Sequence, residues 1–179
     1  MAVWTVIDHQ EIGAGGAASW NKASIASSYT HLYLLGSVRT ERADYFEDGR
    51  LSLNGDTGGN YAWQLLQGNS TGSSGTTAAE ASGEVGFRKW NMTGASADAD
   101  TFGALSVWIP NYAGTVGYKQ ILLKWGASGT STTNAQFSVG MYAGLWSDTS
   151  AIDEITIETN DGEDIAQYST FTLYGITGV

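Results

Sequence analysis

A glycine-rich loop carries the side chains best suited to bind a ligand. Asn54-Gly55-Asp56 is followed closely by Asn60 and Tyr61. Carboxylate and carbonyl oxygens on such a loop are the hard ligands that calcium prefers, and the same groups could hydrogen-bond a sugar. Asn and Asp also commonly cap backbone N–H groups inside a turn. The loop therefore predicts either a ligand site or a turn that satisfies its own backbone.

A second acidic group precedes this loop, at Asp44, Glu47 and Asp48. Combined with the glycine-rich loop, it leaves Asp44, Asp48 and Asp56 as weak calcium candidates. Three acids in an exposed loop can equally well face solvent. The chain has no cysteine, which excludes disulfides and thiolate metal sites. We expect no cofactor.

The residue types needed for catalysis are scarce or badly placed. His9 and His31 are the only histidines, and no G-x-S-x-G nucleophile elbow occurs. The acids lie mainly in loops, so no pair is marked as the acid and base of a glycosidase. The stretch 13–18 matches G-x-G-x-x-A but lacks the amphipathic helix that a dinucleotide site requires. We predict a protein that is not an enzyme and has no catalytic residue.

Four tryptophans are candidates for binding a partner or ligand. Exposed indole rings stack on sugars and also dominate subunit interfaces. The alternative is that these rings pack in the core or on a sheet face. The candidates are Trp4, Trp90, Trp108 and Trp146.

The charge of the chain limits its partners. The formal net charge is −10, from 18 acidic and 8 basic residues. A nucleic-acid groove needs clustered Lys and Arg, so binding to DNA or RNA is disfavoured. No window approaches the roughly 18 apolar residues of a membrane span, and no signal peptide is apparent. We expect no membrane partner and assembly in a reducing cytoplasm.

The pattern of side chains predicts an all-β fold. Apolar and polar residues alternate in about ten short segments separated by turn residues, which is typical of an antiparallel β-sandwich. On His31–Thr40 both faces carry apolar groups, so this strand should lie centrally in a sheet. Phe137, Val139 and Met141 share one face of a later strand. The other strands are expected around 51–53, 61–65, 84–92, 102–110, 116–125, 155–157 and 171–176.

Three other segments are assigned from composition. Residues 1–19 should form an N-terminal arm or first strand plus a Gly/Ala turn, and residues 20–179 one sandwich domain. The charged stretch 39–49 predicts an exposed loop. The stretch 69–83 has no bulky apolar side chain and predicts a long, mobile surface loop that could order on assembly.

Two motifs resemble a recurring domain of tailed-bacteriophage virion proteins. The first is Thr30–Thr40 followed by Leu51–Tyr61, and the second is the ending Tyr168–Ile176. Where that family often has Gly-Ser-Arg before Phe-Thr-Leu-Tyr-Gly-Ile, this chain has Tyr168-Ser169-Thr170. The resemblance implies a jelly-roll-like β-sandwich, often trimeric, with no catalytic residues to carry over.

The resemblance also implies a set of functions. Some family members decorate capsids, and others form parts of tail fibres. We expect a capsid cement (decoration) protein on the outer surface of the virion, a homotrimer that binds the major capsid protein. The alternative is a small tail-fibre or receptor-binding module that recognises a host surface glycan. A third possibility is a bacterial carbohydrate-binding accessory protein.

Overall fold

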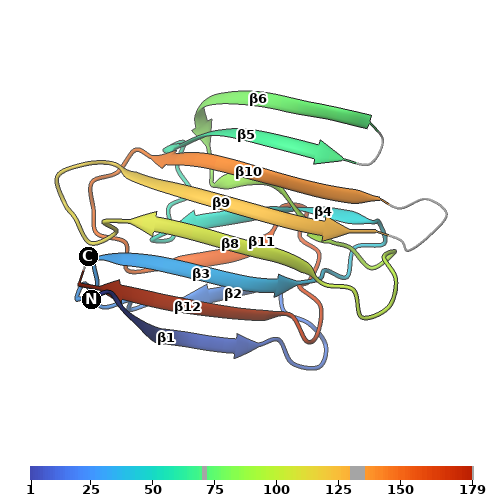
Figure 1. Cartoon of the computed structure of the whole chain (residues 1–179), viewed down its shortest axis with the longest axis horizontal. Coiled ribbons are helices and arrows are strands. Elements are labelled where there is room, and N and C mark those ends of the chain that lie inside the picture. Colours follow the sequence, from blue (N-terminus) through green and yellow to red (C-terminus); the bar gives the residue numbers. More distant parts are fainter. Residues whose placement is uncertain (70–71, 130–135, 179) are drawn as a thin grey trace.

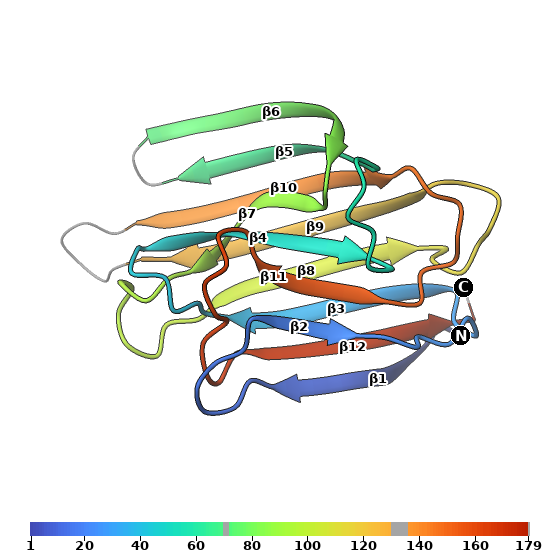
Figure 2. The ribbon, with the colours of Figure 1, turned by 180° about the vertical axis from the view of Figure 1, so that it is seen from behind.

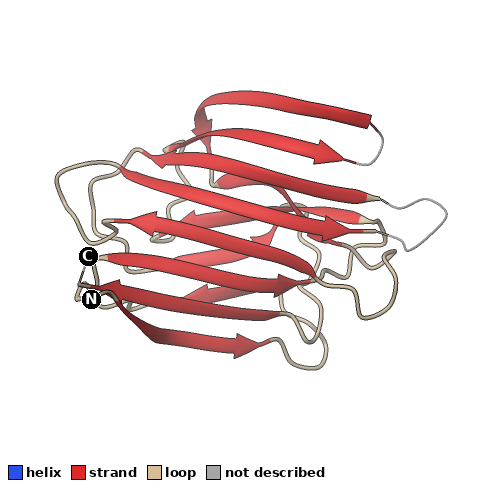
Figure 3. Ribbon diagram, viewed as in Figure 1, coloured by secondary structure: helices blue, strands red, loops and turns tan. Residues whose placement is uncertain are grey.

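Antiparallel strands in two facing sheets make up the chain (Figure 1). The computed structural model describes residues 1–69, 72–129 and 136–178, with residues 69 and 72–82 described by their backbone alone. Within these ranges every regular element is a strand and none is a helix (Figure 3). Accordingly, the described residues contain no apolar helix long enough to cross a membrane. The twelve strands are β1 (Val3–Glu11), β2 (Ser19–Lys22), β3 (His31–Val38), β4 (Phe46–Leu53), β5 (Tyr61–Asn69), β6 (Gly72–Glu84), β7 (Phe87–Thr93), β8 (Gly103–Pro110), β9 (Lys119–Ser128), β10 (Phe137–Trp146), β11 (Ile155–Thr159) and β12 (Thr170–Thr177).

The two sheets differ in size, and in both of them strands from the first half of the chain pair with strands from the second half. The large sheet has eight strands in the order β1-β12-β3-β8-β9-β10-β5-β6, and the small sheet has four, in the order β2-β11-β4-β7. β1 pairs with β12, β2 with β11, and β5 with β10. Seen from behind, the small sheet lies over one face of the large sheet (Figure 2). This nested pairing is that of a jelly roll, and the predicted antiparallel β-sandwich is confirmed.

The core lies between the sheets and follows the period-2 alternation of strands. On β3, Leu32 and Leu34 are buried while Tyr33 and Leu35 point to the opposite face. β3 lies between β12 and β8, so its predicted central position is confirmed. β8 ends at Pro110, as expected of a residue that cannot donate to a ladder.

Two segments expected to be loops contain strands. β4 begins at Phe46, inside the charged stretch 39–49, and Glu47 is only 1% exposed. The charged residues led to the prediction of a loop. In the structure, ion pairs such as that of Asp48 with Lys89 neutralise these charges within a strand. In the stretch 69–83, Gly72 onward belongs to β6, which pairs with β5, while residues 70–71 lie outside the described ranges. An edge strand held by backbone hydrogen bonds needs no bulky apolar residues. At the N-terminus, residues 3–11 form a first strand rather than a free arm.

One close contact in the small sheet predicts a large effect of a small change. A Cβ on Gly49 would lie 2.4 Å from the ring of Trp90, which is fully buried. The ring is held in place because its Nε1 donates to the carbonyl of Phe87 at 3.0 Å. We expect Gly49→Ala to lower the free energy of unfolding by about 2–3 kcal/mol, in the usual range for overpacking.

Chemical denaturation followed by tryptophan fluorescence measures this change. Gly117→Ala is the control, because a Cβ there meets nothing within 4 Å. A Gly49→Ala protein that is as stable as the Gly117→Ala protein would contradict the contact.

Candidate functional site

The glycine-rich loop uses its polar side chains to hold itself together. The carboxylate of Asp56 accepts hydrogen bonds from Trp146 Nε1 at 2.7 Å, Asn60 Nδ2 at 2.9 Å and the backbone N–H of Gly58 at 2.7 Å. Burial alone would raise the pKa of Asp56, but these three hydrogen bonds outweigh it and hold the pKa below its ordinary value. The structure therefore brings Asp56, Asn60 and Trp146 together, in a structural role.

Tyr61 and Asn54 are engaged in the same way. The buried hydroxyl of Tyr61 accepts a hydrogen bond from the N–H of Leu53 at 3.0 Å and lies 3.1 Å from the carbonyl of Asp56. Burial also raises the pKa of this phenol. Asn54 Nδ2 donates to the carbonyl of Ala151, and its Oδ1 accepts from two backbone N–H groups, of residues 153 and 154. These contacts favour the turn that satisfies its own backbone over a ligand site.

The three calcium candidates do not converge. Asp44 accepts from the N–H of its neighbour Tyr45 at 2.7 Å, and Asp48 pairs with Lys89 at 3.0 Å. The carboxylate of Asp56 already accepts three hydrogen bonds from the protein. Across the described residues, no group of three His, Asp or Glu side chains could hold a metal ion.

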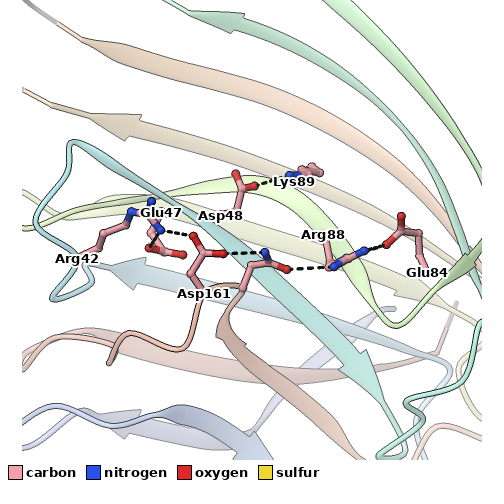
Figure 4. A network of polar contacts seen from close by, with 8 residues as sticks. Arg42, Glu47, Asp48, Glu84, Arg88, Lys89 and Asp161 are labelled. Carbon is pink, nitrogen blue, oxygen red and sulfur yellow. Dashed lines mark hydrogen bonds and ion pairs between the residues drawn. The ribbon is translucent and has the colours of Figure 1, made fainter.

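A polar network joins the acids and bases at the small sheet (Figure 4). Arg42 donates to Glu47 Oε2 at 3.1 Å and also pairs with Asp161. Glu47 is buried, its second oxygen has no hydrogen-bond partner, and burial raises its pKa despite the nearby guanidinium. Arg88 continues the network to Glu84. Because its cations and anions are already paired, this network serves stability.

The four candidate tryptophans separate into two groups. Trp90 and Trp146 are 0% and 1% exposed, so the interpretation of these two as exposed platforms is wrong. Both side chains point inward, and both indole N–H groups are satisfied within the protein. Trp4 is 54% exposed, and Trp108 is half-buried on the outer face of the large sheet.

A row of rings crosses that outer face. Trp4 contacts Tyr33 and Tyr174 edge-on, with ring centroids 5.5 and 5.9 Å apart, and Tyr33 lies 6.2 Å from Trp108. Cross-strand pairing continues this row over six strands, and its second half has no rings: Leu122 and Ala143 are followed by the exposed, polar Gln64. In the order β12 to β5 it reads Tyr174, Tyr33, Trp108, Leu122, Ala143 and Gln64.

Beside the ring row lies a second row with exposed aliphatic side chains. Leu35, Met141 and Leu66 are 40%, 42% and 51% exposed. Leu66 and Met141 rim a hollow of about 250 Å³ that extends over Leu122 and Ala143 of the ring row. In the same strand order this row reads Thr172, Leu35, Ser106, Lys124, Met141 and Leu66.

A third row is made mostly of small residues. It contributes Ser37, Ala104 and Gly126 to a groove of about 510 Å³, whose other wall includes Leu35 and Lys124 of the second row. At its far end Val139 is 61% exposed. The row reads Thr170, Ser37, Ala104, Gly126, Val139 and Gly68. We call these three rows the contact face.

The contact face is almost free of charge, in a chain with 26 charged residues. Lys124 is the only Asp, Glu, Lys or Arg in its three rows, all of which are described. A large exposed apolar patch with few charges is typical of a surface that binds another molecule. Leu66 was not singled out from the sequence, and Met141 was named only as part of an apolar strand face, not as a residue that binds a partner. The signal available was that this face carries only apolar residues.

No family model matches the chain, and no curated protein matches it significantly. Three galectin structures share its general layout. Toad ovary galectin in complex with thio-digalactose is 10% identical, with 88% of this chain and 98% of that chain covered and a TM-score of 0.34. Caenorhabditis elegans galectin LEC-6 is 8% identical, with 95% and 96% covered and a TM-score of 0.35. CG-16, a homodimeric agglutinin from chicken liver, is 8% identical, with 89% and 99% covered and a TM-score of 0.32. Similarities of this size support no argument about what this chain does.

Proposed function

We propose that this chain is a non-enzymatic structural protein of a tailed-phage virion, a cement protein that binds the outer surface of the assembled capsid. The observation that supports this most is the contact face, which offers a broad apolar surface with one charge. The two sequence motifs at 30–61 and 168–176 point to the same family of virion proteins. Assembly takes place in the host cytoplasm.

The mechanism is mass-action stabilisation through protein contacts. A cement that binds the assembled shell, and not the free capsid subunit, shifts the equilibrium toward the shell. Two further surfaces can contribute, because β1 and β6 are the outermost strands of the large sheet and each has one edge without a strand partner among the described residues. The major capsid protein and further copies of this chain are the proposed partners.

Addition of the purified chain to shells that lack it tests the proposal. We expect saturable binding at a fixed number of copies per shell and a higher temperature of shell disassembly. Absence of the chain from the outer surface in a reconstruction of the mature virion would overturn the proposal.

The edge strand β1 gives a sharper version of this test. Deletion of residues 1–11 removes β1 but keeps Ile12, which is 1% exposed and part of the core. The truncated chain should still unfold cooperatively and should bind shells at least about tenfold more weakly, a loss of about 1.4 kcal/mol. If it saturates shells at the wild-type concentration, β1 makes no shell contact.

A second candidate function is recognition of a surface glycan, as in a small tail-fibre module. The groove of the contact face favours it, because Ser37, Ser106, Thr170 and Thr172 place hydroxyl groups beside Lys124. The row of rings lies next to that groove and offers stacking surfaces. A glycan array distinguishes the two functions. Binding to a defined glycan with only a few copies per virion would favour the fibre module.

A further inference from the structure

We propose that the contact face packs against the contact face of a second copy of this chain, around a twofold axis that runs parallel to the strands between β8 and β9. The inference rests on the proposed function only in treating this face as a protein contact, and a face covered by a second copy leaves the outer edges of β1 and β6 for the shell. It goes further by naming the occupant and the registration of the two copies, and it replaces the homotrimer that the resemblance implies with a pair.

The size of the face suits a stable pair. The six strands that carry the contact face lie about 4.8 Å apart and span roughly 24 Å, and strands of about eight residues are roughly 27 Å long. The resulting area of about 650 Å² lies at the lower end of the roughly 600–1,000 Å² that each partner buries in a stable protein interface.

The distribution of charge favours a copy of the same chain as the occupant. With a net charge of −10, two copies repel each other over most of their surface. Lys124 is the single charge on the contact face, so no carboxylates meet there. The axis places each Lys124 over Ser106 of the other copy, next to the second Lys124, and the long side chains must carry both ammonium groups to solvent. A basic partner selected by charge would find its complement elsewhere on the molecule.

Ridges on the contact face of one copy meet grooves on the contact face of the other copy around this axis. The axis places β10 of one copy over β3 of the other, and β5 over β12, within the same row. Met141 and Val139 then lie over Leu35 and Ser37, so the exposed aliphatic ridge of one copy enters the groove of the other.

In the row of rings, too, a large side chain of one copy lies over a hollow of the other. The axis places Tyr33 of one copy over Ala143 of the other, at the hollow of about 250 Å³. Trp108 lies over Leu122. Large side chains thus meet small ones or hollows at Tyr33 over Ala143 and at Val139 over Ser37, which is the packing that facing sheets require.

Measurement of the mass of the free chain in solution, by sedimentation or by light scattering, tests the pair. We expect the wild-type chain to be a pair at about 10 µM, a concentration at which complexes with micromolar Kd are largely formed. Met141→Glu and Leu35→Lys should each raise the dissociation constant by about 100-fold or more, because each buries an unpaired charge against an apolar residue. Val116→Glu is the matched control, since Val116 is 95% exposed and lies outside the contact face; it should remain a pair.

Mixing the two weakened variants tests the twofold registration. In a mixed pair the new glutamate of one copy faces the new lysine of the other, while the second contact keeps its wild-type Leu35 and Met141. Within one copy these positions are three strands apart, about 14 Å, and cannot pair. We therefore expect the mixture to form pairs although neither variant does alone. Thermal unfolding of each variant checks that the fold is intact.

Four outcomes would overturn the inference: a monomeric wild-type chain, a mass of three copies, wild-type behaviour of both single variants, or a mixture that stays monomeric. A monomeric free chain that still saturates shells would leave the proposed function standing. A pair in solution that never binds shells would overturn the proposed function and leave the pair standing.

Discussion

Replacing Arg42 with alanine should lower the free energy of unfolding by about 3 kcal/mol at pH 7. Arg42 is the cation paired with Glu47, whose side chain has no exposed area. Without the guanidinium, a buried carboxylate remains with one oxygen already lacking a hydrogen-bond partner. The Arg42 side chain is 35% exposed, so water can enter the vacated space and keep the loss at the lower end of the range for broken buried pairs.

The loss should depend on pH in a way that identifies Glu47. Burial raises the pKa of Glu47 in the folded protein above its unfolded value of about 4.3. The stability that protonated Glu47 contributes is therefore present below about pH 4 and is lost as pH rises through the folded pKa. Removal of Arg42 raises that pKa further, so the effect of Arg42→Ala should shrink as pH falls from about 7 toward 4.

Chemical denaturation at several pH values measures the Arg42→Ala effect. Arg50→Ala is the control, because Arg50 pairs with Glu158 at 2.7 Å while both side chains are more than a quarter exposed. Such a pair contributes about 0–1 kcal/mol. Equal losses for the two variants, or a loss for Arg42→Ala that does not change with pH, would contradict the role of buried Glu47.

Asp56→Ala should lower the free energy of unfolding by about 3 kcal/mol at pH 7. The carboxylate accepts three hydrogen bonds, including one from the indole of buried Trp146. A hydrogen bond to a charged group contributes about 1.5–3 kcal/mol. The N–H groups of Gly58 and Asn60 are exposed and can bond water in the variant, so most of the loss comes from the indole N–H of Trp146. The glycine-rich loop should lose its fixed conformation, with a change in the fluorescence of Trp146.

The pH dependence of this second variant should differ from that of the first. The folded pKa of Asp56 is lowered, so its contribution is present above the unfolded pKa of about 3.9 and is lost as pH falls through the folded pKa. The effect of Asp56→Ala should therefore stay constant down to about pH 4. Asp56→Asn keeps one acceptor oxygen and should lose markedly less stability. Equal losses for the alanine and asparagine variants would show that the indole hydrogen bond contributes little.

Alternation of side chains was sufficient to predict the sandwich and most of its strands. On β3 it also placed the strand centrally, because Leu35 and Tyr33 add apolar groups to the face opposite Leu32 and Leu34. Composition predicted loops for two segments that contain strands, because these strands are held by ion pairs or by backbone hydrogen bonds instead of by buried apolar side chains. Glu47 is buried in β4 beside Arg42, and β6 is held by backbone pairing with β5.

The orientation of β10 could not be derived from the sequence. Val139 and Met141 share an apolar face, yet that face is exposed and the opposite face is buried. The inner face uses Gly140 and Gly144, where a Cβ would lie 2.1 Å from Trp125 and 2.5 Å from Phe87. Rings from other strands fill the core at these glycines, and such long-range packing leaves no local signal. The contact face was missed for this reason.

The central claim is that the contact face is covered by protein in the assembled particle. Oxidative labelling of free chain and of intact particles, read by mass spectrometry, measures the exposure of Met141, in the contact face, and of Trp4, whose ring packs on Tyr33 and Tyr174 at the edge of that face. Tyr118 is the internal control, because it is 58% exposed and lies outside the contact face. We expect Met141 and Trp4 to be protected in particles while Tyr118 is labelled in both. Labelling of Met141 in particles at the rate found for the dilute free chain would contradict the claim.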